Sequence, residues 1–223
     1  MRLSRFPGLG GWGDDPLWGT FYDWTVEHPG VGGAIWRAGV QSDLRLLYEA
    51  AAEIGRQPAG SRILDVPCGG GVALRGLRPG QAVEYVAADI SQTMLDRTMD
   101  AARGWHVADQ VEPVIADVGD LPLDEGDADL VVSFTGLHCF PHPELAVSEM
   151  ARVLKPEGII TGSALLNDSR RYEPLRRAGR RAGLLGPGGT GDEIVHWLTR
   201  SGIADVTLEV SGAIGYFRGV RRD

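Results

Sequence analysis

The chain has 223 residues, which suffices for one hydrophobic core but is short for two ordinary domains. Its net charge of −8 argues against a general role on nucleic acid or anionic membranes, which bind clustered basic side chains. Two cysteines without metal-ligand spacing do not make a disulfide framework, and they predict no metal site. Apolar runs are too short to span a bilayer and no secretory leader is evident, so we expect a cytoplasmic location.

Residues 1–42 are predicted to form an amino-terminal arm or lid, and residues 43–223 a single α/β domain. The arm is rich in Gly, Pro and Trp and shows no sustained periodicity. Its aromatic side chains would either close over a flat or apolar substrate or simply tether the arm to the sheet. They are Trp18, Phe21, Tyr22, Trp24 and Trp36. Asp43 then predicts the N-cap of a helix that runs to Gly55, because apolar residues recur there at helical spacing.

Beyond this helix, segments with strand and helix patterns alternate along the chain. Strands are expected at about 62–66, 83–88, 111–115, 128–134, 158–165, 203–210 and 214–220. Helices are expected at about 71–77, 91–102, 143–154, 171–182 and 191–201. The alternation predicts a Rossmann-like, doubly wound sheet of about seven strands, mostly parallel and covered on both faces. Only Ser211-Gly212-Ala213 joins the last two strands, so this pair is predicted to be an antiparallel hairpin.

Ligands of open parallel sheets bind beyond the carboxyl ends of the strands, so the residues that follow each predicted strand are candidates. The first strand is followed by Pro67-Cys68-Gly69-Gly70-Gly71, whose glycines let the backbone approach a ligand closely. Asp89 ends the second strand and is able to accept both hydroxyls of a ribose, because Ser91 can cap the next helix instead. Asp117 follows the third strand and offers an acceptor for an exocyclic amino group, with the Val118 amide beside it. Taken singly, each of these features also fits an ordinary turn.

Five segments, Ile63–Gly71, Ala88–Leu95, Ala116–Pro122, Asp129–Ser133 and Glu149–Gly158, carry a resemblance to a known family. In order and spacing they resemble the motifs of class I S-adenosylmethionine-dependent methyltransferases. The most similar subgroup is the small-molecule, ubiquinone-biosynthesis-like (type 11) methyltransferase domain. The resemblance implies an enzyme that binds S-adenosylmethionine and transfers its methyl group to oxygen, carbon or nitrogen of a small-molecule acceptor.

The resemblance also implies which residues bind the cofactor. They are Tyr22, Asp65, Pro67, Cys68, Gly69, Gly71, Asp89, Ile90, Met94, Asp117, Val118 and Ser133. Asp65, the glycine-rich turn and Ser133 would lie near the methionine moiety. Asp89 would bind the ribose hydroxyls, and Asp117 with Val118 the adenine edge. Ile90 and Met94 would pack against the adenine or the ribose.

Pro67 departs from the pattern of the resembled family, which usually has glycine at this position. Proline fixes φ and removes an amide donor, so we expect cofactor binding to survive in a weakened form. Tyr22 resembles, by its position before the first helix, a residue that often contacts the cofactor in the family.

Methyl transfer from a sulfonium is an in-line displacement, which mainly requires that the acceptor be placed opposite the sulfur. A base helps if the acceptor is a hydroxyl or an acidic carbon, and the candidate is His138, after the fourth strand. A packing role is an equal alternative for His138. Six arginines further on would either attract an anionic substrate group or form a solvated helix face. They are Arg170, Arg171, Arg176, Arg177, Arg180 and Arg181.

Two other classes of protein compete with this interpretation. For an NAD(P)-dependent oxidoreductase, the turn lacks the third glycine of the dinucleotide fingerprint. A Tyr-x-x-x-Lys catalytic pair is also excluded, because Ala151 stands four residues before the single lysine, Lys155. A non-catalytic S-adenosylmethionine-binding protein on the same scaffold remains compatible with the sequence, because a fold alone does not determine activity.

Overall fold

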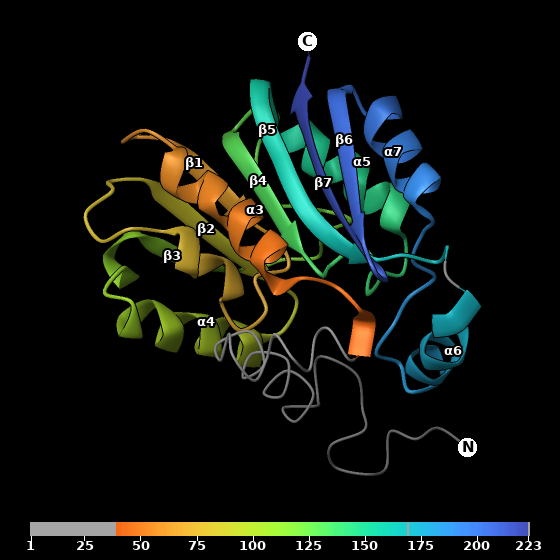
Figure 1. The fold of residues 1–223 in the computed structure, drawn as a ribbon. Helices are drawn as coiled ribbons and strands as arrows, with labels where there is room; N and C mark the ends of the chain where they lie inside the picture. The colour runs from red at the N-terminus through yellow and green to blue at the C-terminus, as the bar shows by residue number, and fades with distance from the viewer. Residues whose placement is uncertain (1–38, 169, 223) are drawn as a thin grey trace.

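A seven-stranded sheet forms the centre of the molecule (Figure 1), as seen in a computed structural model that describes residues 39–168 and 170–222. The strand order is β3-β2-β1-β4-β5-β7-β6. The strands are β1 Arg62–Asp65, β2 Glu84–Asp89, β3 Val111–Ile115, β4 Ala128–Phe134, β5 Leu154–Leu165, β6 Ile203–Ser211 and β7 Ile214–Arg221. Strands β1 to β5 are parallel, and β7 pairs antiparallel with both β5 and β6. The predicted sheet and its carboxy-terminal hairpin are confirmed.

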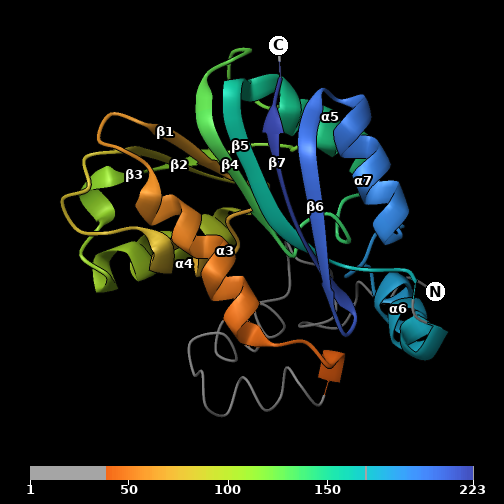
Figure 2. The same ribbon diagram turned by 45° about the horizontal axis from the view of Figure 1, so that its top comes forward.

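The helices cover both faces of the sheet (Figure 2). They are α3 Leu44–Arg56, α4 Gln92–Gly104, α5 Pro143–Val153, α6 Glu173–Arg181 and α7 Gly191–Arg200, with the 3-10 helices η1 Val72–Gly76, η2 Ala108–Gln110 and η3 Arg170–Tyr172. One apolar cluster contains side chains of α3, η1 and α4, and the other contains side chains of α5 and α7. Helix α6 lies to one side of these two layers (Figures 1 and 2). The arm's aromatic residues Trp18, Phe21, Tyr22, Trp24 and Trp36 lie outside the described residues.

Helix α3 starts where the sequence predicts. The Asp43 side chain accepts a hydrogen bond from the Arg45 amide at 3.0 Å, which satisfies one of the free amides of the first turn. Leu47 and Ile54 are fully buried against the sheet, as their helical spacing indicates. The helix extends one residue past the predicted end, to Arg56.

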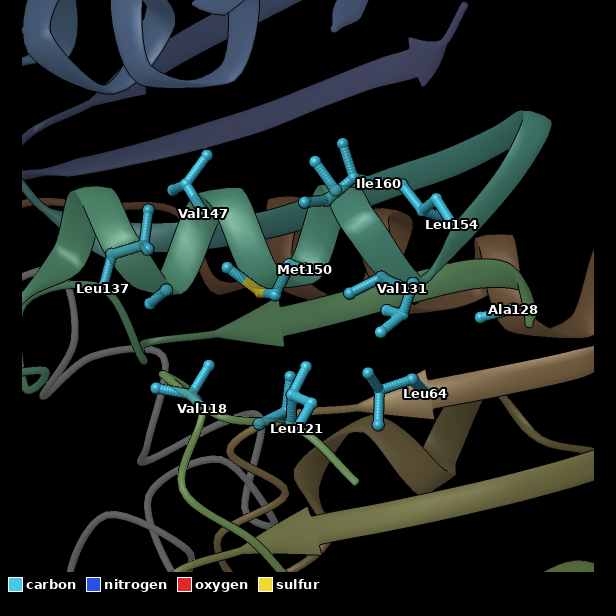
Figure 3. Close-up of a cluster of buried hydrophobic side chains, with 14 of the residues drawn as sticks. Leu64, Val118, Leu121, Ala128, Val131, Leu137, Val147, Met150, Leu154 and Ile160 are labelled. Carbon is cyan, nitrogen blue, oxygen red and sulfur yellow. The ribbon is translucent and has the colours of Figure 1, made fainter. Parts of the chain in front are cut away.

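The cluster between α5 and the sheet shows why the central strands are almost entirely apolar. Leu64 of β1, Val131 of β4 and Ile160 of β5 meet Val147 and Met150 of α5 in a closely packed layer (Figure 3). Neighbouring residues on the same strands face the opposite cluster, so both faces of each strand are buried. This arrangement holds the carboxyl ends of β1, β2 and β4 rigidly beside one another.

Three predicted elements differ from the structure by more than a residue or two at their ends. The segment 71–77 was expected to be an α-helix but forms only the 3-10 helix η1, which begins after Gly71 in the left-handed region and has no side-chain cap. Strand β5 begins at Leu154 rather than at residue 158. The expected helix at 171–182 is divided into η3 and α6, where Pro174 occupies the first turn of the second helix.

Helix η1 is short because its backbone lies directly against α3. A Cβ atom added at Gly76 would lie 2.0 Å from the carbonyl oxygen of Ala51 and 3.1 Å from the Cβ of Ile54. We therefore expect Gly76→Ala to lower the free energy of unfolding by roughly 2 kcal/mol or more, because backbone must move to admit the methyl group. Urea denaturation measures the change.

The matched control for this substitution is Gly104→Ala, at the end of α4. An added Cβ there meets no atom within 4 Å. Equal stability of the Gly76→Ala variant and the wild-type protein would show that α3 and η1 are not in backbone contact.

Candidate functional site

A pocket lies at the carboxyl ends of the parallel strands, and most of the predicted cofactor residues line it. These are Asp65, Pro67, Cys68, Gly69, Asp89, Ile90, Met94, Asp117 and Val118. They come from the ends of β1, β2 and β3 and from the first turn of α4. The parallel arrangement therefore brings together four segments that are far apart in sequence, as expected for an open α/β sheet.

The glycine-rich turn after β1 is tied to strand β2. The Cys68 amide donates to the carbonyl oxygen of Ala88 at 2.9 Å, and the Gly69 amide donates to the Asp89 carboxylate at 3.1 Å. Gly69 has φ of +51° and Gly71 has φ of +85°, so both adopt the left-handed conformation that glycine tolerates best. The turn thus presents backbone, rather than side chains, at Gly69 and Gly70 in the pocket wall.

Pro67 fits into this turn with a cis peptide bond to Val66. Its ring also lies near the segment that follows β4, because a Cβ atom at Gly136 would be 2.4 Å from the proline Cδ. The weaker binding expected from Pro67 stays a prediction.

Asp89 is 6% exposed, and its carboxylate already accepts two backbone amides. Its Oδ1 accepts from the Ser91 amide at 2.9 Å, and its Oδ2 accepts from Gly69. Ser91 occupies the N-cap position of α4 as expected, but its side chain makes no capping hydrogen bond, and Asp89 is not free because it accepts the Ser91 amide. A carboxylate has about four lone-pair sites, so about two remain for a ligand. Burial raises the pKa of Asp89, and the amides that it accepts oppose this shift.

Asp65 is the most deeply buried charged side chain of the site, at 1% exposure. The Tyr85 hydroxyl donates to its Oδ2 at 2.7 Å, and within the described residues the carboxylate has no cationic partner. Burial raises the pKa of Asp65 to about 8, the hydrogen bond from Tyr85 opposes this rise, and the Asp89 carboxylate adds to it. Asp65 is therefore mostly protonated at neutral pH until a cation reaches it.

Asp117 lies at the exposed mouth of the pocket. Its Oδ1 accepts from the Gly119 amide at 2.9 Å, which orients the carboxylate. The neighbouring Val118 is buried, whereas Ile90 on the adjoining strand end is 68% exposed. An exposed apolar side chain at a pocket mouth is suited to stacking against a flat ligand.

Two predicted cofactor residues, Gly71 and Ser133, do not line the pocket. Gly71 instead supports the turn, since its Cβ would lie 3.2 Å from the Cβ of Ala101 on α4. The Ser133 hydroxyl is fully buried without a hydrogen-bond partner in the described part of the chain. Tyr22 lies outside the described residues.

His138 also lies away from the pocket lining. Its Nδ1 accepts a hydrogen bond from the Leu165 amide at 3.0 Å, so a neutral His138 carries its proton on Nε2. Burial lowers the pKa of His138 to about 4. The role of His138 as a general base stays a prediction that this geometry does not favour.

Sequence reasoning missed several residues of the site. Thr98 of α4 donates to the carbonyl oxygen of Gly69 at 2.7 Å, and Tyr85 binds Asp65 from β2. The wall after β4 was also missed; it is formed by Phe134, Thr135, Cys139, Phe140 and Pro141. Tyr85 is the one aromatic residue of β2 and precedes three buried aliphatic residues, which is a weak signal. These wall residues lie on both sides of His138 in the sequence, whereas His138 itself does not line the pocket.

Two of the six arginines in the segment after β5 donate to backbone carbonyl oxygens. Arg176 is 4% exposed and donates to the carbonyl oxygens of Leu166 and Asn167 and to Glu173. Arg180 donates to the carbonyl oxygens of Gly186 and Pro187. These two side chains tie α6 to the loops around it and form neither a solvated helix face nor a free anion site.

Residues 39–168 and 170–222 contain no group of three or more His, Cys, Asp or Glu side chains arranged to hold a metal ion. In the same ranges, no helix is both long enough and apolar enough to cross a membrane.

The known proteins that this chain matches in sequence are described as methyltransferases. A family profile described as "Methyltransferase domain" matches residues 64–161. The chain is 35% identical to a ubiquinone/menaquinone biosynthesis C-methyltransferase (UbiE) from Ectopseudomonas oleovorans, over 51% of this chain and 68% of that protein. It is 31% identical to an uncharacterized chloroplastic methyltransferase of Arabidopsis thaliana, over 57% of this chain and 36% of that protein. The chain thus spans about a third of the plant relative.

Among solved structures, phosphoethanolamine N-methyltransferase 2 of Haemonchus contortus, in complex with S-adenosyl-L-methionine, is similar in fold. The TM-score is 0.71 at 14% identity, over 92% of this chain and 57% of that one. At this identity the likeness concerns the fold alone.

The buried Asp65 predicts a specific pH dependence of stability. Between pH of about 4 and about 8 the folded protein holds a proton on Asp65 that the unfolded chain releases, so this residue lowers stability as pH rises. We expect the free energy of unfolding of Asp65→Asn, relative to wild type, to increase steadily over this range in urea titrations. Asp96→Asn, on the exposed face of α4, should show a much smaller trend. A constant difference between Asp65→Asn and wild type would contradict the buried neutral carboxyl.

Proposed function

The chain belongs to the S-adenosylmethionine-dependent methyltransferase family, and on this premise we propose that it transfers the methyl group of S-adenosylmethionine to a small-molecule acceptor. The observation that carries the proposal is a pair of buried carboxylates, Asp65 and Asp89, that line one pocket beside a glycine-rich turn. Within the described part of the chain, no Lys or Arg side chain lines that pocket. A ligand that supplies a cation and hydrogen-bond donors would stabilise the charged forms of buried acids of this kind.

S-adenosylmethionine supplies an activated methyl group on a sulfonium, together with an ammonium, two ribose hydroxyls and an adenine amino group. The pocket contains an acceptor suited to each kind of donor. Asp65 would hold the ammonium, since a cation is what stabilises its charged form. Asp89 would accept from the ribose hydroxyls with the lone pairs that Gly69 and Ser91 leave.

The adenine end of the proposed site combines apolar and polar groups. Ile90, Met94 and Val118 provide the apolar surface for a flat ring. The Asp117 carboxylate, oriented by the Gly119 amide, would accept from an exocyclic amino group. The residues of the turn would act through their backbone, as Gly69 and Gly70 leave no side chain in the way.

The wall after β4 would shape the acceptor end of the pocket. Phe134, Phe140 and Pro141 are apolar and would exclude water from the reacting centre. Thr135 has φ of +55°, a strained conformation for a β-branched residue, which the Ser163 carbonyl supports through a 2.8 Å hydrogen bond from the Thr135 amide. In-line displacement depends on such a rigid wall to hold the acceptor opposite the sulfur.

The proposal also includes a role for the amino-terminal arm and a cellular location. Residues 1–42 would act as a lid over a domain formed by residues 43–223. The location would be cytoplasmic, although the similar Arabidopsis protein is chloroplastic.

Turnover is the direct test of the proposed activity. The purified chain is incubated with methyl-labelled S-adenosylmethionine and either a demethylmenaquinol or a phenol, a panel suggested by the quinone-biosynthesis relative. We expect S-adenosylhomocysteine and methylated acceptor to form in equal amounts. Binding of the cofactor without product from an extended acceptor panel would favour the non-catalytic alternative. No binding at all would contradict the proposed function.

Asp89 is expected to matter for cofactor affinity. Asp89→Ala removes the acceptors for the ribose hydroxyls and for the Gly69 amide, and hydrogen bonds to charged groups contribute about 1.5–3 kcal/mol each. We therefore expect the Kd for S-adenosylhomocysteine, measured by calorimetry, to rise by at least about tenfold. Asp96→Ala, an exposed acid on nearby α4, is the control and should bind normally. Unchanged affinity of Asp89→Ala would remove this residue from the site.

A further inference from the structure

Tyr85 is a polar residue in the middle of an apolar layer. Its side chain is 0% exposed and packs in the cluster that contains Leu47, Ile63 and Leu74. A phenylalanine would pack in the same space without a hydroxyl to desolvate. Burying a hydroxyl costs free energy unless it makes a hydrogen bond, so the hydroxyl needs a specific partner.

That partner is Asp65. The hydroxyl of Tyr85 donates to Asp65 Oδ2 at 2.7 Å. In the register of the two parallel strands Ile63 is opposite Tyr85, and Asp65 is opposite Ala87. The tyrosine therefore meets a carboxylate whose residue lies two positions, or about 7 Å, further along the sheet toward the carboxyl ends of the strands, where the pocket lies.

We propose that Tyr85 is a positioning residue, which holds the Asp65 carboxylate in the orientation that binds the ammonium of the cofactor's amino-acid end. This inference rests on the proposed function. One oxygen of Asp65 is fixed by the Tyr85 hydroxyl, and the other has no hydrogen-bond partner among the described residues. A donor on one oxygen both orients the carboxylate and stabilises its charge inside the apolar layer.

Two other titratable groups interact with Asp65. Beyond the effect of burial, Asp89 at the end of β2 raises the pKa of Asp65 by charge repulsion. Burial raises the pKa of the Cys68 thiol, and the charge of Asp65 adds to that rise. Of the groups that act on Asp65 in the described ranges, the Tyr85 hydroxyl is the one that favours the charged carboxylate. Losing it should make Asp65 harder to ionise.

Tyr85→Phe tests the proposal, with two ligands. S-adenosylhomocysteine carries the ammonium, whereas 5′-methylthioadenosine has the same adenosine and thioether but no amino-acid end. At pH 7 we expect the variant to bind S-adenosylhomocysteine about tenfold more weakly, as loss of a charge-assisted hydrogen bond predicts. We expect the affinity of the wild-type protein for S-adenosylhomocysteine to rise between pH 5.5 and pH 8 as Asp65 ionises. In the variant this rise should occur at higher pH. Binding of 5′-methylthioadenosine should stay within about twofold of wild type.

Tyr216→Phe is the matched control. The Tyr216 hydroxyl is also buried, lies 3.1 Å from the Ser42 hydroxyl and does not line the pocket. This variant should bind both ligands as the wild type does. If Tyr85→Phe leaves the affinity and pH profile of S-adenosylhomocysteine unchanged, or weakens both ligands equally, the positioning role is wrong. If the wild-type protein binds neither ligand, the proposed function itself fails, and the inference fails with it.

A second variant covers the case in which Tyr85→Phe does not fold. Site-specific 3-fluorotyrosine at position 85 keeps the ring and makes the hydroxyl a stronger donor. We expect its pH profile for S-adenosylhomocysteine to move to lower pH, opposite to the shift of the phenylalanine variant. An unchanged profile would overturn the proposal.

Discussion

The structure of the site depends on one electrostatic constraint: the Asp65 carboxylate is buried in an apolar layer, and no cationic side chain lies beside it among the described residues. A charge in this position is costly, so burial favours the neutral acid. The Tyr85 hydroxyl offsets part of this cost, and a bound ammonium would offset most of the remainder. The same burial that penalises the free carboxylate therefore makes it selective for a cationic ligand group.

The parallel sheet explains how the other groups reach Asp65. Strands β1 and β2 end side by side, and a hydrogen bond from the Gly69 amide to the Asp89 carboxylate joins the two ends. One contact thus positions both the turn near the amino-acid end and the acid proposed for the ribose. Helix α4 supports the same turn through the hydrogen bond from Thr98 to the Gly69 carbonyl. Rigid neighbours of this kind pre-organise a site before its ligand arrives.

Much of this arrangement could be predicted from local sequence signals. The Asp43 cap, the alternation of strands and helices, and the short link before β7 are encoded by residues close together in the chain. The acids at the ends of β2 and β3 follow from strand boundaries and the rule for ligand sites in parallel sheets. The turn glycines were identified for the same reason.

The contacts that side chains make with groups on neighbouring strands and helices could not be predicted from the sequence. The contact between Tyr85 and Asp65 depends on the register of β1 and β2. Asp89 was misjudged because its carboxylate accepts the backbone amide of Ser91, the N-cap residue of α4. His138 was a reasonable base by type and position, yet the Leu165 amide occupies its Nδ1. Arg176 resembled a surface charge, although folding buries it against backbone carbonyls.

Proton release on ligand binding tests the central claim most directly. Calorimetric titration of the wild-type protein with S-adenosylhomocysteine at pH 7, in buffers of different ionisation enthalpy, counts the protons exchanged. A carboxyl with a pKa of about 8 that ionises against an ammonium should release close to one proton, about 0.9 at this pH. Binding of 5′-methylthioadenosine, which has no ammonium, should release almost no protons. Binding of S-adenosylhomocysteine without net proton release would contradict the account, because Asp65 would then be charged before the ligand arrives.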